Sequence, residues 1–224
     1  MKKFDYIVIG AGSGGIASAR RAAKFGKKVA IIENRVVGGT CVNVGCVPKK
    51  VMFNLASFLE DAQYMKHYGV NGLEPTLDFA QLKNARDAYV KRLNGIYMRN
   101  LGNDGISYFQ GLAKFAAQNV VLAGEEKLTA DHILIASGSA PRHIPFPGDE
   151  YCMDSNDFFA MEQLPKSIAV IGGGYIAVEL AQILNTLGVQ TSIIARSQLL
   201  NFVDRDVIDV LGKEIENSGI KLHL

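Results

Sequence analysis

The chain has 224 residues, of which 48% are hydrophobic and 21% are charged, a balance typical of a globular protein that buries a core. The net charge is only +2, and basic pairs such as Arg20-Arg21 and Lys27-Lys28 lie scattered, which argues against nucleic-acid binding. No apolar stretch of the sequence approaches the roughly 20 residues that cross a bilayer. We therefore expect a cytoplasmic protein, without a membrane partner, that has room for two domains.

The first predicted strand leads into a glycine-rich turn. Residues 4–9 are mostly apolar, and the run Gly10-Ala11-Gly12-Ser13-Gly14-Gly15 separates them from a helical stretch that ends at Phe25. Gly10 permits the tight turn, Gly12 lets the backbone approach a pyrophosphate, and Gly15 lets helix and strand pack closely. The N-terminus of the helix attracts the phosphate charge. The pattern predicts a dinucleotide site.

The second predicted strand, residues 29–32, is followed by Glu33. An acidic residue at this point accepts hydrogen bonds from a ribose 2′-OH and repels a 2′-phosphate. The first site is therefore expected to bind an unphosphorylated adenosine.

Two cysteines, Cys41 and Cys46, follow between a glycine-rich turn and a predicted helix start. A disulfide between them would close a very short loop and stabilise the fold little, which favours a redox role. Pro48 suits the first turn of a helix, so Cys46 lies where unpaired N–H groups and the helix dipole favour a thiolate. Two inert buried thiols are the alternative for the spacing alone. The third cysteine, Cys152, is expected to be a structural thiol in a reducing compartment.

Two helices and a set of short strands are predicted next. The first helix carries apolar Met52, Leu55, Phe58 and Leu59 at helical spacing and stops at Gly69, and the second runs from its cap Asp78 to near Gly102. Residues 106–137 alternate apolar runs with turn residues, as a three-stranded antiparallel excursion does. A proline-rich linker follows this segment.

A second strand, turn and helix begin at Ser167. Residues 167–171 precede Gly172-Gly173-Gly174-Tyr175-Ile176-Ala177, and the predicted helix 178–187 stops at Gly188. The position that corresponds to Glu33 is Ala195, and Arg196 follows it. Because the acid is missing and a guanidinium can bind a 2′-phosphate, the pattern predicts NADP(H) rather than NAD(H). A surface arginine at a strand end is the alternative.

The expected fold class is α/β, with two Rossmann-like dinucleotide-binding domains and a small antiparallel β excursion in the first of them. The first domain is predicted to span residues 1–140. The second spans residues 141–224 and is expected to be truncated.

The segment between the two glycine fingerprints reads Gly38-Gly39-Thr40-Cys41-Val42-Asn43-Val44-Gly45-Cys46-Val47-Pro48-Lys49-Lys50. With this segment the chain resembles the glutathione reductases, in the flavoprotein disulfide reductase family. The resemblance covers all 224 residues but only about the first half of a family member, so we expect an N-terminal half that ends within a strand. It implies FAD at the first site and NADPH at the second. It also implies that electrons pass through the flavin to a Cys41/Cys46 disulfide, with Cys46 beside the flavin and Cys41 attacking the substrate disulfide.

The resemblance also implies the residues that serve each site. The catalytic residues are Cys41, Cys46, Lys49 and Glu179. The cofactor-binding residues are Gly10, Gly12, Ser13, Gly14, Gly15, Glu33, Gly39, Thr40, Lys49, Ala113, Ser137, Gly138, Gly172, Gly174, Tyr175, Ile176, Glu179 and Arg196. The substrate-binding residues are Ser13, Arg20 and Tyr97, with Arg20 meeting a glutathione carboxylate. For a lysine, glutamate, arginine or tyrosine taken alone, an ordinary surface or packing role is the alternative. No metal site is predicted.

Glutathione disulfide is the substrate that the resemblance implies, and a homodimer is the active form. In the family the partner subunit supplies the acid/base histidine from a His-Pro-Thr motif. None of His67, His132, His143 and His223 lies in such a motif, so we expect solvated or packing histidines and a chain that is inactive alone.

Several alternatives stay open at this point. The substrate could be a related disulfide such as a modified glutathione, or the protein could act as a diaphorase. A non-catalytic FAD-binding fragment, or one half of a split flavoprotein, is a further alternative. Ser197 and Asn201 stand where family members present further bases to the 2′-phosphate, which predicts a weaker preference for NADPH.

Overall fold

The computed structural model describes residues 1–72, 75–142 and 145–224. These residues form two compact units, of which the first contains Met1–Pro48 and Arg86–Phe159 and the second contains Lys49–Ala85 and Ala160–Leu224. The units are defined by packing, whereas the domains predicted from the sequence are defined by the nucleotide that each would bind. The two divisions therefore need not coincide.

The first unit is built around a sheet of six strands. Its elements are β1 (Lys2–Ile9), α1 (Ser13–Lys24), β2 (Val29–Glu33), α2 (Gly39–Val44), the start of α3 (Cys46–Met65), most of α4 (Phe79–Asn103), β3 (Ser107–Gln110), β4 (Ala113–Ala117), β5 (Val120–Ala123), β6 (Glu126–Ile135), the 3-10 turn η2 (Asp149–Tyr151) and most of α5 (Ser155–Ala160). The strand order is β3-β2-β1-β6-β5-β4.

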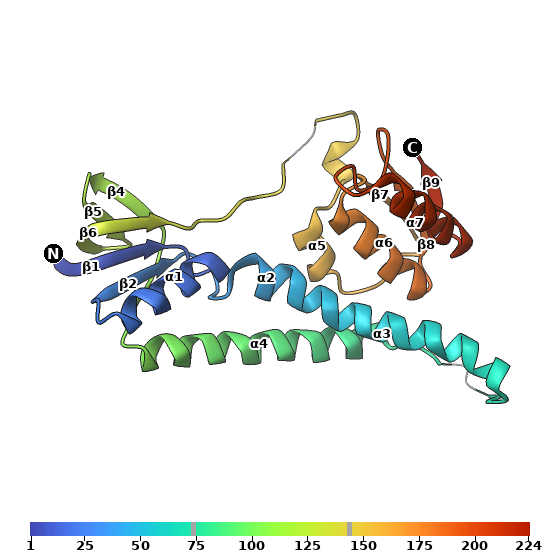
Figure 1. Cartoon of the computed structure of the whole chain (residues 1–224), viewed down its shortest axis with the longest axis horizontal. Coiled ribbons are helices and arrows are strands. Elements are labelled where there is room, and N and C mark those ends of the chain that lie inside the picture. The colour runs from blue at the N-terminus through green and yellow to red at the C-terminus, as the bar shows by residue number, and fades with distance from the viewer. Residues whose placement is uncertain (73–74, 143–144) are drawn as a thin grey trace. The chain divides into compact units, whose positions relative to one another are not determined.

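Strands β3, β2, β1 and β6 pair in parallel, and this order is typical of a Rossmann-like dinucleotide-binding unit. Strand β5 pairs antiparallel with β6, and β4 pairs antiparallel with β5. Figure 1 shows β4, β5 and β6 beside β1. The segment 106–137 therefore holds four strands, because β3 joins the parallel part of the sheet and β6 belongs to both parts.

The strands of this sheet bury alternate residues in two separate clusters. Ile7 lies in a cluster with Phe4 and residues of β5 and β6. Val8, the next residue of β1, lies in a cluster with Ala19 of α1 and Leu101 of α4. Because successive side chains of a strand point to opposite faces, this alternation shows that both faces are covered. Helices α1 and α4 cover one of them (Figure 1).

The second unit holds a smaller sheet. Its elements are most of α3, the 3-10 turn η1 (Lys66–Tyr68), the first turns of α4, β7 (Ser167–Ile171), α6 (Tyr175–Thr186), β8 (Gln190–Ile194), α7 (Arg205–Asn217) and β9 (Lys221–His223). The strands pair in parallel in the order β7-β8-β9. Ala181 of α6, Ile193 of β8 and Ile215 of α7 belong to one buried cluster.

The helix ends follow the predicted signals. Asp78 caps α4, since its Oδ1 accepts a hydrogen bond of 3.0 Å from the backbone N–H of Gln81. Gly69 ends the turn after α3 in the left-handed conformation, with φ of 82°. The predicted helix with apolar Met52 and Phe58 is α3, in which Met52 is fully buried and Phe58 is 70% exposed.

Helices long and apolar enough to span a membrane are absent from the part of the chain that the structure describes.

Gly15 marks the closest contact between α1 and the turn before it. A Cβ at this position would lie 1.9 Å from the carbonyl oxygen of Gly10, so a larger residue must push the helix away from β1. We expect Gly15→Ala to lower the free energy of unfolding by about 1–3 kcal/mol. Gly14→Ala is the matched control, because nothing lies within 4 Å of its added Cβ. Urea unfolding measures both variants, and equal loss of stability would contradict the packing argument.

Candidate active site

The first glycine turn is held by backbone contacts on both sides. Gly10 has a φ of 105°, and its N–H donates to the carbonyl oxygen of Ile32 at 2.7 Å. A Cβ on Gly10 would lie 2.3 Å from the carbonyl oxygen of Ala136, so Ser137 and Gly138 follow directly beside the turn. Helix α1 begins after its N-cap Gly12. Because glycine has no side chain with which to cap, the first N–H groups of α1 are available to an anion.

A second glycine pair lies against this turn. Gly38 and Gly39 have φ values of 108° and 62°, and the N–H of Gly38 donates to the carbonyl oxygen of Ala11 at 2.8 Å. A Cβ on Gly39 would lie 2.6 Å from the Cα of Gly12, which only a glycine allows. The two backbones therefore pack too closely for side chains at Gly39, and a turn surface without side chains suits a pyrophosphate. Thr40, the next residue, is exposed.

Glu33 supports the turn as well as offering a carboxylate. Its Oε2 accepts the N–H of Ala11 at 2.7 Å and its Oε1 accepts the N–H of Arg35 at 2.8 Å. The residue is 8% exposed. Each carboxylate oxygen has a second lone pair, so Glu33 can hold the turn and still accept hydrogen bonds from ribose hydroxyls. The predicted residue Ala113 begins β4 and packs, partly buried, against the cluster that contains Ile32.

The two predicted redox cysteines lie close together on consecutive helices. Cys41 is in α2, a short helix that the sequence did not predict, and Cys46 is the first residue of α3. Both are thiols in the structure. A Cβ on Gly45 would lie 2.8 Å from the carbonyl oxygen of Thr40, so a glycine is needed where α3 approaches α2.

Burial raises the pKa of the Cys41 thiol, and the hydrogen bond and charge of Cys46 raise it further. Hydrogen bonds from the Ser13 hydroxyl and the Cys46 backbone act in the opposite direction and lower the pKa of Cys41. The structure thus brings Ser13, Cys41 and Cys46 together. Cys46 itself is exposed.

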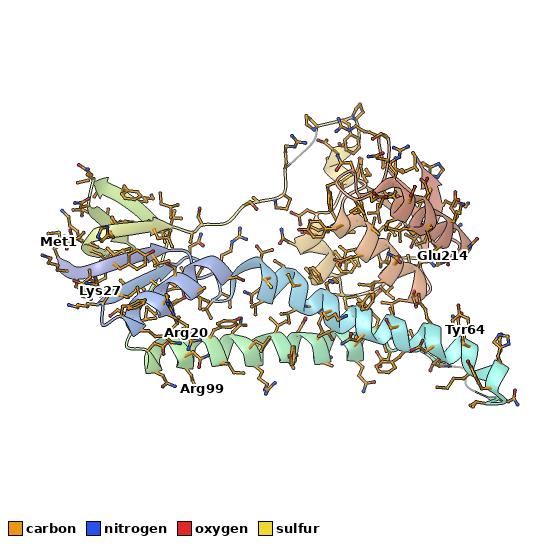
Figure 2. All side chains as sticks on the ribbon, viewed as in Figure 1. Met1, Arg20, Lys27, Tyr64, Arg99 and Glu214 are labelled. Carbon is orange, nitrogen blue, oxygen red and sulfur yellow. The ribbon has the colours of Figure 1, made fainter. Side chains whose placement is uncertain are left out.

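The three predicted substrate-binding residues line one pocket of about 360 Å³. Its lining consists of Ser13, Ile16, Ala17, Arg20, Arg21, Lys24 and Tyr97. Three of these side chains are cationic, so the pocket suits an anionic ligand. Figure 2 labels Arg20 where it projects from α1.

Asp104 is a residue of this site that sequence reasoning missed. Its carboxylate pairs with Nε of Arg20 at 2.5 Å and raises the pKa of that guanidinium. Because Nε is occupied, the two terminal nitrogens of Arg20 keep donors for a carboxylate ligand. The two residues stand 84 positions apart, and no local pattern links them.

The glycine turn of the second unit repeats the geometry of the first. Gly172 has a φ of 128°, and its N–H donates to the carbonyl oxygen of Ile194 at 2.8 Å. Gly174 is the N-cap of α6, with an extended conformation like that of Gly12. The first helical residues, Tyr175 and Ile176, are exposed by 60% and 45%.

The loop after β8 lies against this second turn. A Cβ on Gly173 would lie 2.7 Å from the carbonyl oxygen of Gln198. Arg196 is exposed in the same loop. Arg205, at the start of α7, donates from Nη1 to Oε1 of Gln198 at 2.5 Å. A second base that sequence reasoning missed therefore reaches the loop that carries Arg196.

Lys49 and Glu179 form an ion pair of 2.9 Å between Nζ and Oε1. Lys49 belongs to α3 and Glu179 to α6, and their side chains are 21% and 39% exposed. The structure therefore joins two residues that only the family resemblance had singled out.

The remaining cysteine and the histidines lie at the surface. Cys152 is exposed, so the expectation of a structural thiol was wrong. His67, His132 and His223 are exposed as well, and His143 lies outside the described residues. Over residues 1–72, 75–142 and 145–224, no group of three or more His, Cys, Asp or Glu side chains is arranged to hold a metal ion.

Two glycine turns at helix starts, together with a dithiol beside the first turn, are typical of dinucleotide-dependent disulfide oxidoreductases. Residues 4–224 match the family model described as pyridine nucleotide-disulphide oxidoreductase, and the chain belongs to that family. Membership of this family implies FAD and NADPH as cofactors.

Curated relatives named glutathione reductase match almost the whole chain. The protein of Schizosaccharomyces pombe is 45% identical over 234 residues, which cover 99% of this chain and 50% of the relative. The protein of Yarrowia lipolytica is 45% identical over 234 residues, which cover 98% of this chain and 50% of the relative. The protein of Debaryomyces hansenii is 43% identical over 225 residues, which cover 88% of this chain and 46% of the relative. The chain spans about half the length of these relatives.

Ser13 is expected to control the ionisation of Cys41. Because its hydrogen bond lowers the pKa of Cys41, Ser13→Ala should move the alkylation of this thiol to higher pH. The measurement is the rate of iodoacetamide labelling of the Cys41 peptide against pH. Ser18→Ala is the control, since Ser18 lies on the same helix but pairs with Tyr6. An unchanged midpoint in Ser13→Ala would show that the two groups do not interact.

Proposed function

We propose that the chain takes part in NADPH-dependent reduction of glutathione disulfide, through FAD and a redox disulfide of Cys41 and Cys46. The observation that carries the proposal is the pocket lined by Ser13, Arg20 and Tyr97, because Ser13 is also the hydrogen-bond partner of Cys41. A cationic pocket beside a thiol suits a disulfide that carries carboxylates. In this proposal the complete enzyme is a cytoplasmic homodimer.

The proposed FAD domain comprises residues 1–140. The glycine turn and the N-terminus of α1 hold the pyrophosphate, and Glu33 accepts hydrogen bonds from the adenosine ribose. When bound, FAD supplies the exchange between a hydride donor and a dithiol. Lys49 and Glu179 are the proposed charge pair that accompanies the flavin, which their ion pair of 2.9 Å supports.

The proposed NADPH domain comprises residues 141–224. Gly172 and Gly174 shape the turn for the pyrophosphate, as Gly10 and Gly12 do in the first unit. Arg196 binds the 2′-phosphate. Arg205 adds a second positive charge to the same loop through its bond to Gln198, which supports a preference for NADPH despite Ser197 and Asn201.

The proposed thiol chemistry gives the two sulfurs different roles. The Cys41 thiolate attacks one sulfur of the substrate, which forms a mixed disulfide and releases one glutathione as a thiolate. The Cys46 thiolate then attacks the Cys41 sulfur, so the second glutathione leaves and the Cys41–Cys46 disulfide forms. The pair loses two electrons, which the substrate gains. Burial raises the pKa of Cys41, and the Ser13 hydrogen bond, which lowers that pKa, favours the thiolate that the attack requires.

Residues 1–224 alone are expected to turn over glutathione disulfide at least about 100-fold more slowly than the same residues combined with the remaining half of the Schizosaccharomyces pombe relative. The departing thiolate needs a proton donor, a contribution of about 100 to 10,000-fold. Ser13 and Cys46 are the side chains that act on Cys41 in the described structure, and in the proposed function the proton donor belongs to the remaining half of the enzyme.

The test follows NADPH oxidation with glutathione disulfide, a modified glutathione disulfide and lipoamide as separate substrates. Full turnover by residues 1–224 alone would contradict the need for a further acid. If the combined protein reduces none of these disulfides but passes electrons to a dye, a diaphorase replaces the proposed function.

Arg196→Glu in the combined protein should lower kcat/KM for NADPH at least about tenfold more than for NADH. The lost guanidinium and the new carboxylate both act on the 2′-phosphate, and a charged hydrogen bond contributes about 1.5–3 kcal/mol. Arg99→Glu is the charge-matched control, because Arg99 is exposed on α4. Equal losses with both nucleotides would place Arg196 away from the 2′-phosphate.

A further inference from the structure

Asn43 lies between the two cysteines and its side chain closes the turn before α2. Its amide nitrogen donates to the carbonyl oxygens of Gly39 at 2.9 Å, Val37 at 3.2 Å and Val36 at 3.4 Å. One side chain therefore binds the backbone of the whole approach to Cys41. Such side-chain bonds to turn carbonyls hold a backbone shape that a short helix does not maintain alone.

Asn94 of α4 holds Asn43 in this orientation. Its amide nitrogen donates to Oδ1 of Asn43 at 3.0 Å and to the carbonyl oxygen of Val37 at 2.8 Å. The two asparagines stand 51 positions apart, so the bond fastens α2 to a separate helix. Val37 is 3% exposed, and water cannot easily replace the donor that Asn94 supplies to its carbonyl.

The segment between residues 36 and 46 depends on such external bonds. It contains Gly38 and Gly39 in the left-handed region and Gly45 at the junction of α2 and α3. Glycines lose the most conformational freedom on folding, and a helix as short as α2 is marginal without support. Cys41 sits in this segment, so its distance from Cys46 depends on how firmly the segment is held.

We propose that Asn94 is a positioning residue for the Cys41/Cys46 pair. Through Asn43 and the Val37 carbonyl it holds Cys41 beside Cys46, which raises the effective concentration of one thiol at the other and stabilises the disulfide. This inference rests on the proposed redox role of the pair. Tyr97, one turn further along α4, lines the pocket with Ser13. The same face of α4 therefore contributes a residue to the pocket and a residue that bonds to the segment of Cys41.

The test measures the reduction midpoint of the pair in residues 1–224 without flavin. The protein is equilibrated in mixtures of reduced and oxidised dithiothreitol, in which the dithiol gives two electrons and two protons to the oxidised reagent. Acid quenching, alkylation and peptide mass spectrometry then give the fraction of Cys41–Cys46 disulfide. Cys152, which is exposed, serves as the internal standard for labelling.

Asn94→Ala and Asn94→Asp are the test variants, and the aspartate keeps the shape while it removes the donor. We expect the equilibrium constant for disulfide formation to fall about tenfold in both, which corresponds to a midpoint about 29.6 mV less negative. Asn84→Ala is the control, because Asn84 is exposed on the same helix. The equilibrium constant of Asn84→Ala should stay within about twofold of that of the unchanged protein.

A double-mutant cycle separates positioning from general loosening. If Asn94 acts through Asn43, the shift in Asn43→Ala/Asn94→Ala should be smaller than the sum of the two single shifts. Additive shifts, or an unchanged midpoint in folded Asn94 variants, would overturn the proposal. If thermal melting shows that Asn94→Ala does not fold, the milder variant Asn94→Ser, which keeps one donor, replaces it. An unchanged reduction midpoint in folded Asn94→Ser would also overturn the proposal.

Failure of the proposed function gives a different result. If the unchanged protein forms no Cys41–Cys46 disulfide in any mixture of reagents, the proposed redox pair itself is wrong. There is then no reduction midpoint with which the Asn94 variants can be compared.

Discussion

The backbone contact between Gly12 and Gly39 is the constraint on which the first unit's candidate site depends. These glycines let the phosphate turn and the start of α2 approach until a Cβ on Gly39 would lie 2.6 Å from the Cα of Gly12. Ser13 begins α1 directly after this contact and hydrogen-bonds to Cys41. The same close approach of the two glycine turns therefore also places Cys41 beside the start of α1.

Much of this arrangement could be predicted from local pattern. The spacing of Gly10, Gly12 and Gly15 predicts a strand, a turn and a helix. An added Cβ would clash with backbone at Gly10 and Gly15, whereas at Gly12 it would lie 3.7 Å from the Cα of Gly39, an ordinary contact. Glu33 could also be predicted as the acid after the second strand. Its bonds to the N–H groups of Ala11 and Arg35 could not, because they depend on how the turn closes.

The rest of the site arises from contacts between distant segments, for which a single sequence carries no local signal. Asp104 pairs with Arg20, and Asn94 bonds to Asn43, across 84 and 51 positions. Helical periodicity shows which face of α4 is apolar, but it does not show which polar side chain finds a partner. Helix α2 escaped prediction because six residues that begin with a glycine show neither periodicity nor propensity.

In the proposed function, one backbone motif serves two different nucleotides. The N–H of Gly10 bonds to Ile32 and that of Gly172 bonds to Ile194 at nearly equal distances, so the turns are equivalent. The two units differ after the second strand of each, where one unit has Glu33 and the other has Ala195 followed by Arg196. A carboxylate at this strand end favours a ribose with a free 2′-hydroxyl, whereas a guanidinium favours a ribose with a 2′-phosphate. In the proposed function, phosphate binding follows from the shared backbone, whereas discrimination between nucleotides follows from the side chains after the second strand, of which Glu33 also holds its own turn through the N–H of Ala11.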